Sequence, residues 1–76
     1  MNIRYRNAIY KSMLFNERVK SWSINDYDKE DVVISVFTYK GNKLDIHLSY
    51  RADFTIKEFV ETMEREIEER DNWKDL

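Results

Sequence analysis

The sequence predicts a small α+β domain in the order α-β-β-β-α, in which a three-stranded antiparallel sheet packs on an amphipathic C-terminal helix. Three observations predict this class: a helical apolar stripe near the C-terminus, two strand-like segments on either side of the only glycine, and a length of 76 residues. That length suits a single domain over residues 1–76. Absence of cysteine excludes a disulfide scaffold and cysteine-based catalytic or metal sites.

The C-terminal helix is predicted from Thr55 to Asp71. Thr55 has the position of an N-cap, and Glu58, three residues later, completes a capping box. Apolar residues then recur at the spacing of one helix face, which is expected to pack on the sheet. They are Ile56, Phe59, Val60, Met63 and Ile67.

The antiparallel strands are expected within residues 19–50, and residues 40–43 are predicted to form a hairpin turn around Gly41. We expect an odd-length loop, because that register gathers the apolar residues of both strands on one face. It needs a left-handed residue, which Gly41 or Asn42 can supply. The gathered residues are Val32, Ile34, Val36, Leu44, Ile46, Leu48 and Tyr50.

The N-terminal half is less regular. A first strand is predicted from Val19 to Ile24, followed by a polar connection over Asn25–Asp31. A helix is predicted within residues 2–17, with its clearest periodicity from Tyr5 to Phe15, although the alternation at its start leaves a strand open. Asn16 is expected to end this helix in a left-handed conformation.

The charges are distributed unevenly, although the net charge is only −2. Residues 1–24 hold five basic residues and one acidic residue, whereas residues 51–76 hold five basic and nine acidic residues. A molecule with a basic front and an acidic back can steer a charged partner or align two copies of itself. We therefore weigh interaction surfaces at both ends of the chain.

The expected function is that of a non-enzymatic protein–protein interaction module that binds a macromolecular partner or self-associates. Two surfaces are candidates: the second face of the sheet, and a negative stripe on the final helix that also includes Asp71 and Asp75. The candidate interaction residues are Val33, Phe37, Tyr39, His47, Glu61, Glu64 and Glu68. The composition, which is typical of an AT-rich genome, favours an accessory protein of a phage or mobile element.

The alternative function is single-stranded nucleic-acid binding, because the N-terminal segment interleaves cations with aromatic rings. The candidate residues are Arg4, Tyr5, Arg6, Tyr10, Lys11, Arg18 and Lys20, with Trp22 nearby. The element order resembles that of the double-stranded-RNA-binding domain, which presents lysines on its final helix. The final helix here is acidic, so that duplex RNA binding is not expected, and the net charge places the alternative second.

Catalysis is not expected. The only histidine, His47, has Asp45 and Ser49 on its own side of the strand, but each is about 7 Å away, too far for a catalytic relay. The acidic run at 26–31 lacks the glycine and glutamate positions of an EF-hand. We therefore expect no metal, cofactor, small-molecule substrate or membrane partner, and a cytoplasmic location.

Overall fold

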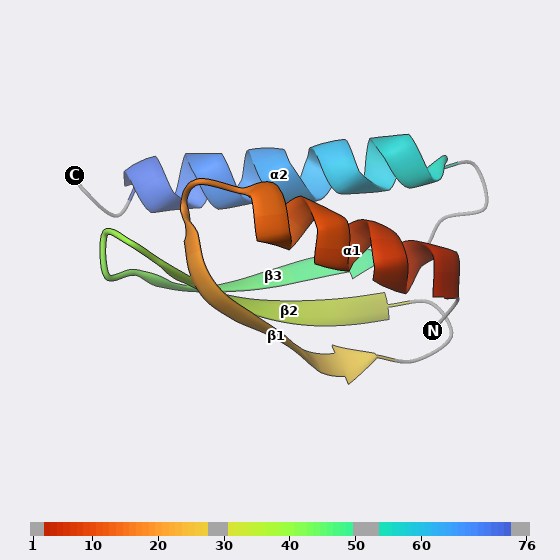
Figure 1. Ribbon diagram of the computed structural model, residues 1–76, viewed down its shortest axis with the longest axis horizontal. Helices are drawn as coiled ribbons and strands as arrows, with labels where there is room; N and C mark the ends of the chain where they lie inside the picture. Colours follow the sequence, from red (N-terminus) through yellow and green to blue (C-terminus); the bar gives the residue numbers. More distant parts are fainter. Residues whose placement is uncertain (1–2, 28–30, 50–53, 74–76) are drawn as a thin grey trace.

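The computed structural model describes residues 3–27, 31–49 and 54–73. It confirms the predicted α+β class and element order (Figure 1). The elements are α1 (Ile3–Phe15), β1 (Val19–Tyr27), β2 (Asp31–Thr38), β3 (Lys43–Ser49) and α2 (Ile56–Trp73). The strands form one antiparallel sheet in the order β1-β2-β3. The expectations for residue 2, residues 28–30, Tyr50 and Asp75 lie outside the described residues.

Both helices cover the same face of the sheet, with α2 over β3 and α1 beside it (Figure 1). The inner residues of β2, namely Val32, Ile34 and Val36, are at most 1% exposed. They form one core with apolar residues of β3 and both helices, and each such side chain contributes roughly 1.5–3 kcal/mol through burial. The helices supply Ile9, Met13, Phe59, Met63 and Ile67 to this core.

The β2–β3 hairpin has the predicted odd register. Ile34 lies opposite Ile46 and Val36 opposite Leu44, so that the apolar residues of the two strands share the inner face. In the turn, the amide of Gly41 donates to the carbonyl of Thr38 at 3.0 Å. Gly41 has φ of 92°, which confirms the left-handed position expected there.

Strand β1 is longer than predicted. It continues to Tyr27, although Asn25–Asp31 was expected to be a polar connection. Two register shifts, between Val19 and Ser21 and between Ile24 and Asp26, let the edge strand absorb extra residues and stay paired. Asn25 also donates a hydrogen bond to Ser35 on β2, so that a polar residue supports the sheet on its outer face.

The end of α1 differs from the expectation, whereas the start of α2 agrees with it. Non-glycine residues with positive φ are absent from the described residues, so that Asn16 does not end α1 in a left-handed conformation. Its side-chain Oδ1 instead accepts the amide of Arg18 at 3.0 Å. At the start of α2, the amide of Glu58 donates to Thr55 Oγ1 at 3.1 Å, which confirms the N-cap.

Helix α2 ends at Trp73 rather than at Asp71. Side chains of its last turn are held by residues of the hairpin turn and of the α1–β1 connection, which keeps this turn helical. No described helix combines the length and the apolar character needed to cross a membrane.

Candidate functional site

A groove with a volume of about 690 Å³ lies between α1 and α2. We call it the helical groove and define it by the apolar residues Ala8, Phe15, Ile56 and Val60 together with Glu61, Glu64 and Glu68. The helices run in the same direction, since Tyr5 meets Phe59 near their first turns and Ser12 meets Glu64 further along. The groove therefore follows both helices along their length.

The three predicted glutamates of α2 all line the helical groove. Glu64 accepts a hydrogen bond from Ser12 Oγ at 2.9 Å, which ties this part of α2 to α1. Glu68 Oε1 lies 3.8 Å from Arg18 Nη2, and Glu61 Oε1 lies 4.0 Å from Lys57 Nζ. The groove thus has an acidic wall, with single basic residues at intervals.

Helix α1 exposes a set of large apolar side chains, of which only Tyr10 was a candidate binding residue from the sequence. Leu14 is 76% exposed and Phe15 74%, and Ile3 and Tyr10 are also exposed. These are four of the six large hydrophobic residues that are exposed in the described part of the chain. The available signal was the run Met13-Leu14-Phe15, because three consecutive helical residues span about 200° of the helix and cannot all point into the core.

A second, smaller hollow of about 410 Å³ lies between α1 and β1 and is lined by Tyr10, Leu14 and Trp22, among others. The rings of Tyr10 and Trp22 meet edge to face with centroids 4.7 Å apart. The guanidinium of Arg6 lies 5.4 Å from the centroid of the Tyr10 ring. Two cations and two rings of the basic N-terminal segment are therefore gathered here, because Lys11 also lines the hollow.

The other candidates for nucleic-acid binding are separated. The Tyr5 ring packs on Phe59, with centroids 5.0 Å apart, and belongs to the edge of the core. Arg18 makes ion pairs with α2. Arg4 is exposed on α1, and Lys20 is exposed on β1.

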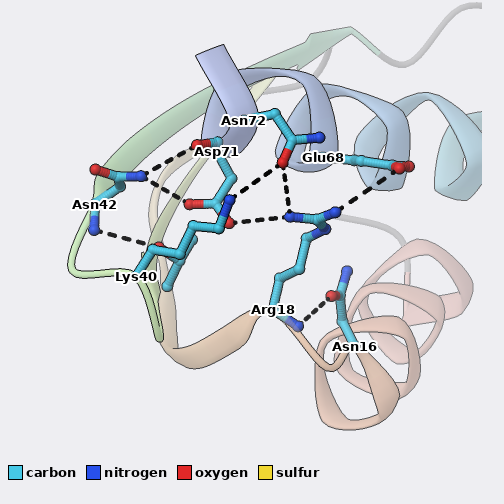
Figure 2. A network of polar contacts seen from close by, with 8 residues as sticks. Asn16, Arg18, Lys40, Asn42, Glu68, Asp71 and Asn72 are labelled. Atoms are coloured by element: carbon cyan, nitrogen blue, oxygen red, sulfur yellow. Dashed lines mark hydrogen bonds and ion pairs between the residues drawn. The ribbon is translucent and has the colours of Figure 1, made fainter. Parts of the chain in front are cut away.

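A polar network, which we call the Asp71 clamp, joins three segments at the far end of the helices (Figure 2). Asn42 Nδ2 donates to Asp71 Oδ1 at 2.8 Å, and Arg18 Nη1 donates to Asp71 Oδ2 at 3.3 Å. Asn72 Oδ1 accepts from Arg18 and from Lys40 at 3.2 and 3.3 Å. The clamp therefore holds the α1–β1 connection and the hairpin turn against the last turn of α2.

Asp71 does not belong to a surface stripe, contrary to the expectation from sequence, because its side chain is only 1% exposed. Burial raises the pKa of Asp71, but hydrogen bonds from Asn42, Thr38 and Arg18 and the charge of Lys40 lower it by more. The net result is a pKa below the ordinary value for aspartate. This carboxylate is a structural group that the fold keeps ionised.

The outer face of the sheet holds the remaining candidates. Phe37 is 45% exposed, with Lys43 Nζ 5.9 Å from its ring centroid, and Tyr39 is 71% exposed in the turn. Val33 is half-buried and His47 is exposed. Ser35 separates Val33 from Phe37 along β2, so that the apolar residues of this face alternate with polar ones.

The polar side chains of the outer face bond to one another. Ser35 Oγ donates to Asp45 at 2.8 Å, and Ser49 Oγ donates to Asp31 at 2.8 Å. Asp45 and Ser49, which flank His47 on the same face of β3, thus form hydrogen bonds with residues of β2. The described residues contain no group of three histidine, cysteine or acidic side chains placed to hold a metal ion.

Comparison with protein-family models, with curated proteins and with solved structures gives no match to this chain. We therefore infer function from the surfaces described above.

Proposed function

We propose that this chain is a non-enzymatic protein-binding module and that its binding surface is the helical groove with the exposed side of α1. One observation carries the proposal: most of the large apolar side chains that the described chain exposes lie on this one helix. Exposed apolar residues that gather on one element indicate an interaction site, whereas single apolar residues scattered over the surface are ordinary. The composition supports an accessory role in a phage or mobile element.

The chemistry of the surface indicates which partner it suits. Leu14 and Phe15 offer apolar area, and the acidic wall of the helical groove offers Glu61, Glu64 and Glu68. A protein segment with apolar and basic side chains complements both features, because opposite charges at the rim favour encounter and correct orientation. The outer face of the sheet suits this role less well, since its serine and aspartate side chains bond to one another.

Photo-crosslinking tests this assignment directly. A benzoylphenylalanine is placed at Phe15, which is 74% exposed, or at Tyr39, which is 71% exposed and lies in the hairpin turn. Because both probes are equally accessible, they report the surface that is used rather than exposure. In cells of the native host, we expect protein adducts from position 15 and few from position 39. Adducts from position 39 alone, or from neither position, would contradict the proposal.

Single-stranded nucleic-acid binding is a second candidate, supported by the stacking of Arg6 on the ring of Tyr10 beside Trp22. It has less support, because Tyr5 and Arg18 are engaged inside the molecule. It predicts an affinity for single-stranded DNA that falls steeply with salt and is lost in the double variant Arg4→Ala and Arg6→Ala. A fluorescence anisotropy titration at low salt that shows no binding would eliminate it.

A further inference from the structure

We infer that the partner bound by this surface is a second copy of the same chain, with α1 of each copy lying against α2 of the other. The inference rests on the proposed function, and it adds the identity of the occupant. It is carried by the exposed apolar residues of α1, by the charges of the two helices, and by the fact that both helices lie on one side of the sheet (Figure 1).

Helix α1 has the chemistry that the helical groove requires of its occupant. Its thirteen residues include three basic side chains and no acidic one. Two of its most exposed apolar residues, Leu14 and Phe15, are close in sequence to the exposed Lys11. An apolar and basic helix is therefore already present on the surface of every copy.

Helix α2 has the opposite character. Apart from the buried Asp71, it carries six acidic side chains and three basic ones. Glu61, Glu64 and Glu68 line the side next to α1, and the half-buried Val60 adds apolar surface there. The α1 surface of one copy and the α2 surface of another are thus complementary in charge.

The arrangement of the helices lets two copies pair α1 with α2 at two places at once. Helices α1 and α2 run in the same direction on one face. A two-fold axis that lies in the plane of contact, parallel to the helices, therefore places α1 of each copy against α2 of the other. The same contact is then made twice, as in a closed isologous dimer. A translated arrangement would leave one α1 and one α2 uncovered.

The size of the surface is sufficient for such a dimer. The molecule measures 35 × 20 × 19 Å along its principal axes, and the helical layer extends over one of its long sides (Figure 1). A side of that size is comparable to the ~800 Å² that each partner buries in a typical stable interface.

Sedimentation equilibrium of the purified chain tests the inference. We expect a reversible dimer that weakens as salt is raised, because screening reduces the attraction between α1 and α2. The double variant Leu14→Ser and Phe15→Ser should weaken dimerisation at least about tenfold, since it removes the apolar anchors. The matched double variant Phe37→Ser and Tyr39→Ser changes two apolar residues of the outer face and its turn, and it should dimerise like the wild type.

Charge reversal identifies which helices meet. Lys11→Glu and Glu61→Lys should each weaken self-association when studied alone, because each places like charges across the contact. An equimolar mixture of the two variants should form heterodimers more tightly than either variant forms homodimers. Glu69→Lys, which changes the same charge on α2 at an exposed position outside the groove, serves as the control.

Three results would overturn the inference. One is a monomer at every concentration up to about 1 mM at low salt. Another is a dimer that dissociates in the outer-face variant and not in the α1 variant. The third is an adduct at position 15 that joins the chain to a different protein and never to a second copy of itself. In that case the proposed function stands, and the inference that the partner is a second copy is wrong.

Discussion

Helix α2 holds its acidic side chains in two different settings along its length. At the Asp71 clamp, Asn42 and Arg18 donate hydrogen bonds to the carboxylate of Asp71, whose side chain is only 1% exposed. In the helical groove, charged side chains of the same kinds stay at the surface beside exposed apolar residues. Burial turns an acidic residue into a structural tie in the first case, whereas exposure leaves acidic residues available to a partner in the second. Substitutions at the two places should therefore have different effects.

The largest expected effect comes from breaking the clamp. Asp71→Ala should lower the free energy of unfolding by about 2–3 kcal/mol, because it removes the buried carboxylate that accepts hydrogen bonds from Asn42 and Arg18. Urea denaturation followed by circular dichroism measures the change. Glu69→Ala, an exposed acidic residue two positions earlier in α2, should change stability by less than about 0.5 kcal/mol. An equal loss of stability in both variants would show that the contacts of Asp71 contribute no more than those of an exposed acidic residue.

Acid should weaken the same contact without removing any atoms. The pKa of Asp71 is lower in the folded chain than in the unfolded chain, so that the ionised carboxylate stabilises the fold. This stabilisation is fully present above the unfolded pKa of about 3.9, and it is lost as the pH falls through the pKa of the folded chain. The Asp71→Asn variant has no ionisable group at this position and therefore lacks this pH-dependent stabilisation. The stability difference between wild type and Asp71→Asn should therefore be constant above about pH 5 and narrow at lower pH. A difference that stays constant down to pH 2 would contradict the assignment.

A smaller effect is expected at the turn that presents Asn42 to the clamp. Gly41 has φ of 92°, and an added Cβ would meet no atom within 4 Å. Gly41→Ala should therefore cost about 1 kcal/mol through backbone strain alone, without a steric clash. Gly41→Asn should cost less, because asparagine tolerates the left-handed region better than alanine does. Thermal unfolding of the two variants makes the comparison, and an equal loss in both would argue against backbone strain as the cause.

The sequence was sufficient for the features that depend on local pattern. The stripe from Ile56 to Ile67 predicted α2 and its buried face, and the alternation around Gly41 predicted the hairpin register. These features follow from periodicity and from one conformationally special residue. The length of β1 did not follow, because an edge strand with two irregular positions shows no strict alternation.

The candidate site was predicted only in part. The acidic residues Glu61, Glu64 and Glu68 were selected correctly as neighbours on one helix face, and the helical groove that they line became apparent only once α1 was placed beside α2. Asp71 shares their spacing but is buried, because the hairpin turn covers the last turn of α2. Such a distinction depends on contacts between segments about thirty residues apart, which the pattern of a single helix does not contain.

The smallest expected effect on the isolated chain comes from the exposed side of α1. Leu14 and Phe15 are each about three-quarters exposed, so that replacing both with serine removes little buried area. At low concentration, the double variant should unfold within about 0.5 kcal/mol of the wild type. At high concentration, the two should diverge, because a dimer stabilises the wild type by mass action and its melting temperature then rises with concentration. Differential scanning calorimetry over a range of concentrations measures both limits. A large loss of stability at low concentration would mean that these side chains hold the fold together, and α1 would then resemble the clamp rather than the open groove.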